Sequence, residues 1–244
     1  MRCAAVLLLS LVACTRAPRP ALAVAAAADL TGVLEPLGQE YEQERGVHVA
    51  FTFGASGLLE RQLEQGAPFD LFLSADTAFA EKAAASGACD GATLAPYATG
   101  RLALWQPAGA KPIVDLIELA GLSRVAIANP DTAPYGRAAR QALEKANVFR
   151  SLGAKLVLAE NVRQALQVAQ SGNAEAAIVS LPLARAATPG QFQELDADGH
   201  APLVQALVVC RNGRALAEAE AFAARLRSSA VQARLQAHGF GPPP

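Results

Sequence analysis

Apolar runs alternate along this chain with segments whose apolar residues recur every three or four positions. The stretch VAAAADLTG, residues 24–32, reads as a buried strand of small residues that runs straight into a helix. That helix keeps its apolar residues on one face, at Leu30, Val33, Leu34, Leu37 and Tyr41. RGVHVAFTF then predicts a strand over 47–53, and FDLFLSAD predicts another buried strand. Such alternation is typical of an α/β protein with mainly parallel strands.

The second half of the chain repeats this arrangement. After the strand and turn RVAIANP come the helix YGRAARQALEKA, the strand and capped helix AKLVLAENVRQALQVAQSG, and the strand AEAAIVSLP. The apolar strand LVQALVVC follows a polar loop and leads into two helical segments. We therefore predict two α/β lobes. The first holds residues 24–101 and, because the chain crosses back, 207–244; the second holds residues 102–206.

The first residues have the pattern of an export signal. One arginine precedes the apolar run 4–13, which is too short to span a membrane in the mature protein. LVAC, residues 11–14, resembles a bacterial lipobox, which implies cleavage before Cys14 and a lipid anchor on its sulfur. We therefore assign residues 1–23 to the signal and a tether, and the protein to the periplasm or cell envelope. The alternative is cleavage after Ala23, which releases an unanchored protein.

Size and charge narrow the choice of partners. A chain of 244 residues with 52% hydrophobic content can bury one large core or two smaller ones. Its 21 basic and 22 acidic residues leave a formal net charge of −1 and no basic block. Nucleic acid and anionic membrane surfaces are therefore disfavoured as electrostatic partners.

The cysteines and histidines show no metal-ligand spacing. His48, His200 and His238 are far apart in the sequence, so we predict no metal site built from them. An oxidising compartment allows Cys89 and Cys210 to pair, but pairing also needs close approach in space. The sequence leaves the pairing open.

Four strand-to-helix junctions are candidates for binding chemistry. They are AAAADL at 25–30, FGASGL at 53–58, NPDTAPYG at 129–136 and AENVR at 159–163. Each places small or turn-forming residues where the first N–H groups of a helix lack partners within that helix. Helix starts of this kind favour anions, because the free donors and the helix dipole both attract negative charge. In open α/β folds, ligands bind at the carboxyl ends of strands, where all four junctions lie.

An ordered series of motifs carries a family resemblance: AAAADLTG, GVHVAFTFGASGLLERQLEQGAPFDLFLSAD, ANPDTAPYGRAARQAL, KLVLAENVRQAL and AAIVS. On these motifs the chain, from residue 24 to 240, resembles the molybdate-binding proteins of bacterial ABC importers. The resemblance implies a two-lobed type II periplasmic-binding fold, in which each lobe is a mixed, mainly parallel sheet flanked by helices. It also implies a monomer that captures molybdate and tungstate, needs no cofactor, and delivers the anion to a membrane permease.

The resemblance further implies a set of ligand donors. In that family, backbone N–H groups and hydroxyls hold a tetrahedral dianion without a charged partner, because fixed dipoles avoid the desolvation cost of a buried charge pair. Carried over to this chain, Ser56 gives a hydroxyl and an N–H, and Tyr135 and Val162 each give an N–H. The family's tyrosine hydroxyl falls on Ser180, and the serine of its first junction falls on Asp29.

Asp29 departs from the family pattern. An ionised carboxylate aimed at a dianion costs several kcal/mol at low dielectric, more than one hydrogen bond contributes. We therefore expect Asp29 to turn away and cap its own helix while its backbone N–H serves the ligand. The alternative is that its carboxyl group enters the site, where it accepts a proton from the ligand or selects another ligand.

Three neighbouring polar residues have simpler interpretations. We expect Arg137 to face solvent or pair with a nearby acid, and Ser74 and Asp76 to mark a strand end and a helix cap. Closure of the lobes about a hinge near 101–104 and 205–208 would bury the ligand.

Enzymes and binding proteins for other anions are the competing classes. GASG does not place Ser56 as a G-x-S-x-G nucleophile would, and the sequence has no Walker A or G-x-G-x-x-G segment. We therefore predict that the chain is not an enzyme. The remaining alternative keeps the fold and changes the ligand to sulfate, phosphate or a small organic anion.

Overall fold

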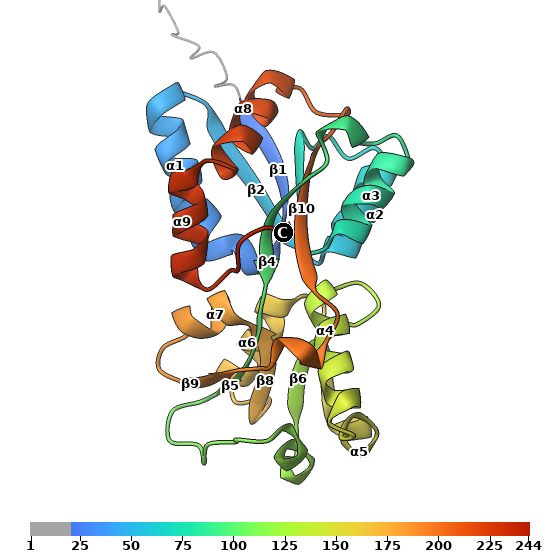
Figure 1. Cartoon of the computed structure of the whole chain (residues 1–244), viewed down its shortest axis with the longest axis vertical. Coiled ribbons are helices and arrows are strands. Elements are labelled where there is room, and N and C mark those ends of the chain that lie inside the picture. Colours follow the sequence, from blue (N-terminus) through green and yellow to red (C-terminus); the bar gives the residue numbers. More distant parts are fainter. Residues whose placement is uncertain (1–20) are drawn as a thin grey trace, which may run out of the picture.

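The computed structural model describes residues 21–244 and arranges them around two five-stranded sheets. The predicted export signal and the lipidation at Cys14 lie outside the described residues. Figure 1 shows the sheets one above the other, with β4 and β10 running side by side toward the second sheet. We call the part around the first sheet the first lobe and the part around the other sheet the second lobe.

The first lobe has the strand order β2-β1-β3-β10-β4. Its strands are β1 (Ala21–Ala27), β2 (His48–Gly54), β3 (Leu71–Ser74), β4 (Ala95–Gly100) and β10 (Leu203–Val209). Its helices are η1 (Ala28–Leu30), α1 (Thr31–Arg45), α2 (Ser56–Glu64), α3 (Thr77–Ala85), η2 (Gly91–Thr93), α8 (Leu216–Leu226) and α9 (Ser229–His238). β1 pairs in parallel with β2 and β3, whereas β10 is antiparallel to β3 and β4.

The second lobe has the strand order β7-β6-β8-β5-β9. Its strands are β5 (Leu102–Gln106), β6 (Val125–Ala128), β7 (Leu156–Ala159), β8 (Ala176–Ser180) and β9 (Gln191–Glu194). Its helices are η3 (Leu116–Gly121), α4 (Pro134–Lys145), α5 (Phe149–Leu152), η4 (Gly153–Lys155), α6 (Val162–Gln170), α7 (Leu181–Ala186) and η5 (Ala197–Gly199). β6 is parallel to β7 and β8, and β5 is antiparallel to β8 and β9.

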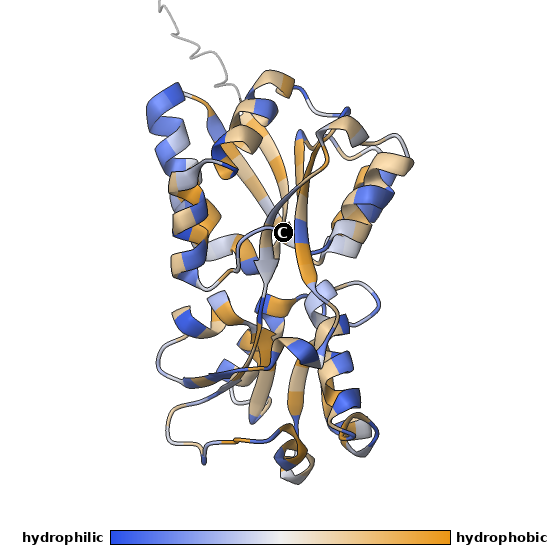
Figure 2. Ribbon diagram, in the orientation of Figure 1, coloured by the Kyte–Doolittle hydropathy of each residue, from blue (hydrophilic) through white to orange (hydrophobic). Residues whose placement is uncertain are grey.

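These sheets confirm the predicted α/β fold with two mixed sheets flanked by helices. Most strands of the two sheets are apolar, whereas the edge strand β9 (QFQE) and many helix residues are polar (Figure 2). The first crossing between sheets lies at Arg101, between β4 and β5. The sequence pattern predicts that the chain returns to the first lobe at residue 207. That position falls inside β10, which already pairs with β4 from Leu203. The whole strand LVQALVV therefore belongs to the first sheet.

The helix faces follow the apolar spacing of the sequence. The apolar residues of the first predicted helix are all buried: Leu30, Val33, Leu34, Leu37 and Tyr41. Asp76 caps α3 by accepting a hydrogen bond from the backbone N–H of Phe79 at 3.0 Å, as predicted. Gly46 ends α1 in the left-handed conformation, with φ of 71°, which glycine adopts without steric cost.

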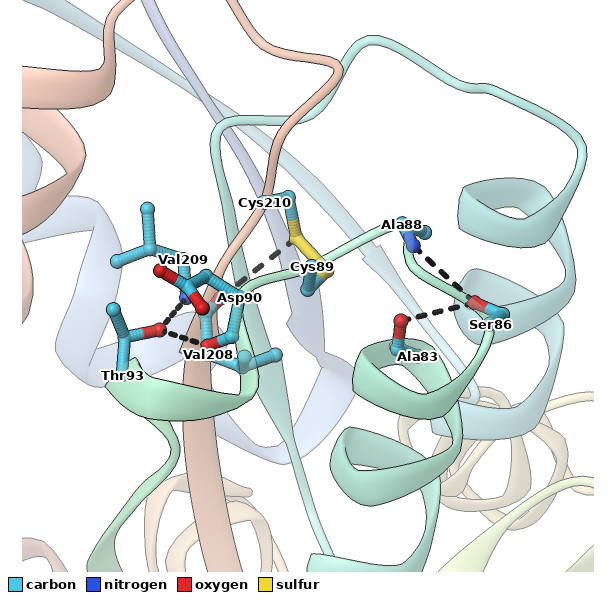
Figure 3. Close-up of a disulfide and its surroundings, with 9 residues drawn as sticks. All are labelled: Ala83, Ser86, Ala88, Cys89, Asp90, Thr93, Val208, Val209 and Cys210. Atoms are coloured by element: carbon cyan, nitrogen blue, oxygen red, sulfur yellow. Dashed lines mark hydrogen bonds between the residues drawn. A yellow bond between two sulfur atoms is a disulfide. The ribbon is translucent and has the colours of Figure 1, made fainter.

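Cys89 and Cys210 form a disulfide (Figure 3), which answers the question that the sequence left open. The two residues face each other in an isolated antiparallel bridge beyond the end of β10. The N–H of Asp90 donates to Val209 O at 2.8 Å, and Thr93 Oγ1 accepts from Val209 N–H at 2.9 Å. These bonds hold the segment around Cys89 along β10, so residues 121 positions apart come into bonding distance.

Candidate functional site

A small cavity lies between the two lobes, at the carboxyl ends of β1, β2, β6 and β7. Its empty volume is about 190 Å³. The lining residues come from all four predicted junctions and from the end of β3: Ala27, Ala28, Asp29, Gly54, Ala55, Ser56, Ala75, Ala133, Pro134, Tyr135, Asn161 and Val162. No Lys, Arg or His side chain is among them. The structure therefore brings the junctions of both lobes to one place, as a shared ligand requires.

Ser56 begins α2 and lines the cavity on the side of the first lobe. The side chain is buried, and its Oγ accepts a hydrogen bond from Ala75 N–H at 3.0 Å. That contact occupies an oxygen lone pair and leaves the hydroxyl proton to be donated elsewhere. The next amide, Gly57 N–H, donates to Thr132 O, and Leu58 N–H donates to Ala55 O. The N–H of Ser56 belongs to the same first turn of the helix and takes part in neither of these bonds.

Tyr135 and Val162 begin the corresponding helices of the second lobe. Pro134 is the first residue of α4 and has no N–H, so the first amide of this helix belongs to Tyr135. At the start of α6, Asn161 Oδ1 accepts from Arg163 N–H at 3.1 Å and from Gln164 N–H at 3.0 Å. The N–H of Val162 is the first-turn donor that this cap does not take.

Asp29 does not cap its helix, so the expectation of a turned-away cap is wrong. Neither η1 nor α1 has a side-chain cap hydrogen bond. The buried carboxylate instead accepts from Gln205 Nε2 of β10, at 2.6 Å from Oδ2. The same Nε2 lies 3.1 Å from the hydroxyl oxygen of Tyr135, in the other lobe. The hydrogen bond from Gln205 is favoured over a local helix cap, because a buried carboxylate without a partner is costly.

Burial raises the pKa of the Asp29 carboxyl group to about 6, and hydrogen bonds from Gln205 and Tyr135 limit the rise. Its second oxygen, Oδ1, has no hydrogen-bond partner among the described residues. A buried oxygen without a partner carries a desolvation cost. Asp29 is thus the one acidic side chain in the lining and is only half satisfied.

Ser180 is not brought to this cavity. It ends β8 and caps α7, where its Oγ accepts from Leu183 N–H at 3.4 Å. The side chain is fully buried. A serine hydroxyl is too short to leave the helix start that it caps, whereas a tyrosine hydroxyl at the same place reaches much farther. The predicted contact of Ser180 with the ligand is therefore not supported by its position.

Two polar residues of the site were missed at the sequence level. Asn161 lines the cavity and orders the start of α6. Its place in AENVR carries the usual signal of an N-cap residue. Gln205 is fully buried in β10 and its Oε1 accepts from the hydroxyl of Tyr97 at 2.8 Å. A single amide within the apolar run LVQALVV is a signal that could have identified it.

Direct contacts join the lobes beside the cavity. Arg137 of α4 forms an ion pair with Asp76 of the first lobe, which agrees with its predicted pairing with an acid. The N–H of Gly57 donates to Thr132 O across the same boundary at 2.9 Å. The structure is therefore a closed arrangement of the two lobes, held together by an ion pair and a backbone hydrogen bond.

Within residues 21–244, no group of three or more His, Cys, Asp or Glu side chains is placed to hold a metal ion. In the same range, no helix has both the length and the apolar character needed to cross a membrane.

Comparison with known proteins identifies the family. Residues 22–241 match the profile of the bacterial extracellular solute-binding protein family. This chain belongs to that family. The solute-binding protein is 32% identical over 226 residues to the molybdate-binding protein ModA of Azotobacter vinelandii, covering 89% of this chain and 88% of the relative. It is also 32% identical to ModA of Rhodobacter capsulatus over 219 residues, 88% of this chain and 86% of that one.

A solved structure agrees with this assignment. The periplasmic molybdate-binding protein of Azotobacter vinelandii superposes on this solute-binding protein with a TM-score of 0.83 and 30% identity, over 91% of this chain and 100% of that one. The family consists of transport binding proteins, so the prediction that the chain is not an enzyme is confirmed.

Proposed function

We propose that this protein captures molybdate in the cavity between its lobes and delivers it to an ABC importer. The observation that carries the proposal is that the helix starts at Ser56, Tyr135 and Val162 all line one cavity whose lining holds no cationic side chain. Neutral donors at helix starts suit a tetrahedral dianion, because they supply positive potential without the desolvation cost of full charges. The relatives named as molybdate-binding proteins support the choice of anion.

The residues that bind the anion and the bounds of the two lobes belong to the same proposal. Ser56, Tyr135, Val162 and the backbone N–H of Asp29 bind the anion. The two lobes, residues 21–101 with 203–244 and residues 102–202, close around it. The protein works as a monomer, and tungstate binds in the same manner because it has the same charge and tetrahedral shape. Closure is favoured by the ligand, since donors of both lobes reach one anion only when the lobes are together.

Calorimetric titration with molybdate, tungstate, sulfate and phosphate tests the ligand. Tight one-to-one binding of molybdate and tungstate, with little response to sulfate or phosphate, is the expected result. Preference for sulfate, phosphate or a small organic anion would leave the fold assignment intact and contradict the assignment of molybdate as the ligand.

Periplasmic location with a lipid anchor on Cys14 completes the proposal. Residues 21–23 support cleavage before Cys14, because they are already part of β1 and pair with β2. Leu22 is fully buried, and Ala23 N–H donates to Asp70 Oδ2 at 2.7 Å. Cleavage after Ala23 would remove these contacts. Mass spectrometry of the processed N-terminus tests this: a lipidated Cys14 is expected, and an unmodified chain starting at Val24 would contradict it.

A further inference from the structure

The cavity combines two features that conflict electrostatically. Helix starts from both lobes favour an anion there, yet the buried carboxyl group of Asp29 lines the same space. Its Oδ2 is held by Gln205, while Oδ1 has no partner within the described part of the chain. In a buried site, an ionised Asp29 carboxylate and a bound dianion repel each other strongly. A proton between them turns this repulsion into a hydrogen bond.

We propose that the site binds its tetrahedral oxyanion together with one proton, which lies between Asp29 Oδ1 and an oxygen of the ligand. This inference rests on the proposed function and makes Asp29 a specificity-determining residue. The proton comes from solvent: the ionised carboxylate, one proton and the dianion form a complex in which an O–H group of one partner donates to the other. No other bond is formed or broken.

The surroundings single out Asp29 as the group that takes the proton. The groups facing it are Gln205 of β10, Tyr135 of α4 and Tyr97 of β4. Burial raises the pKa of both tyrosines well above their usual range, so they stay neutral. α1, α6 and α7 also pack against η1, but none of their charged side chains is buried. Arg137, the charged residue of α4 nearest to Tyr135 in sequence, is paired with Asp76.

The titration of Asp29 is consistent with this role. Without an anion, burial holds its pKa at about 6, so that the group is mostly ionised at pH 7.5. A dianion beside the carboxylate raises that pKa further, because a like charge disfavours the ionised form. Binding at pH 7.5 is therefore accompanied by proton uptake, and affinity rises as the pH falls toward 6.

The variant Asp29→Asn tests the role of the proton independently of the other ligand contacts. The amide oxygen of asparagine can still accept from Gln205, and its NH₂ group supplies a fixed donor where the carboxylate needs a proton. We expect the variant to bind anion with an affinity that is independent of pH. At pH 8.5 it should bind more tightly than the wild type.

The test is calorimetric titration of the mature protein with molybdate at pH 7.5, in buffers of different ionisation enthalpy, and then across pH 6.5–8.5. We expect uptake of about one proton per anion, with affinity falling up to about tenfold per pH unit as pH rises. Asp29→Asn should show no uptake, and Ser180→Ala should behave as the wild type.

Molybdate binding by the wild type with no proton uptake would overturn this inference and leave the proposed function standing. This measurement does not depend on any variant being folded. Failure of both the wild type and Asp29→Asn to bind molybdate at every pH would overturn the proposed function, and this inference with it.

Discussion

The N–H of Gly57, at the start of α2, donates to the carbonyl oxygen of Thr132 in the second lobe at 2.9 Å. This backbone contact crosses the boundary between the lobes beside the cavity. It is possible because residue 57 has no side chain: a Cβ there would lie 2.8 Å from Thr132 O and 2.7 Å from Phe79 Cζ. The ring of Phe79 can move, but the Thr132 carbonyl group can give way only if the lobes separate.

Gly57→Ala is therefore expected to hinder closure and to weaken molybdate binding by about tenfold or more, which corresponds to roughly 1.4 kcal/mol. The free energy of unfolding should change little, because alanine favours the helix. Titration calorimetry measures the first effect and urea unfolding the second. Gly32→Ala is the matched control, since a Cβ at this position in α1 meets nothing within 4 Å. Equal affinities of the two variants would contradict the role of Gly57 in closure.

Ser56 is the first residue of α2 and Ser180 is the N-cap of α7, and the structure predicts different effects when each is replaced. Ser56→Ala removes a hydroxyl from the cavity, so molybdate affinity should fall by about tenfold, the value of one good hydrogen bond. Ser180→Ala removes the cap of α7, which should lower the free energy of unfolding by about 1 kcal/mol and leave affinity unchanged. Parallel titration and urea unfolding of the two variants check this. Loss of affinity in Ser180→Ala would restore a ligand role for that residue.

The buried carboxyl group of Asp29 should also affect stability without ligand. Its pKa rises from 3.8 to about 6 on folding, so the folded state binds the proton more tightly than the unfolded one. The wild type therefore loses stability as the pH rises from about 4 to 6, and the loss persists above that range. Asp29→Asn lacks this penalty and should be more stable at pH 7.5 by up to about 3 kcal/mol. Urea unfolding of both proteins between pH 4.5 and 8 should show the difference shrinking below pH 6; a constant difference would refute the shift.

The disulfide should matter for stability and not for affinity. Cys210 N–H donates to Asp70 O, next to the start of β3, whereas the cavity lies at the other end of that strand, by Ala75. Replacing Cys89 and Cys210 with alanine should lower the free energy of unfolding by about 2–5 kcal/mol. Molybdate affinity should stay within about twofold. Reductant should destabilise the wild type but not this double variant, which serves as the control.

Local patterns in the sequence determined much of the fold. The apolar spacing from Leu30 to Tyr41 is the burial pattern of α1, because one helix face must pack on the sheet whatever its partners are. Small residues before helix starts located the cavity, since parallel strands carry their following junctions to one edge of the sheet. Within these junctions, the resemblance to molybdate-binding proteins selected Ser56, Tyr135 and Val162, and all three line the cavity. Their N–H groups depend only on being at the first turn of a helix.

Tertiary structure decided the features that depend on residues far apart in the chain. The direction of Asp29 is set by Gln205, 176 positions away, whose amide reaches the carboxylate only when β10 joins the first sheet. The pairing of Cys89 with Cys210 likewise requires β10 to lie beside the segment before η2. A buried polar side chain needs a hydrogen-bond partner, and tertiary packing determines whether that partner is a local helix start or a residue far away in the sequence.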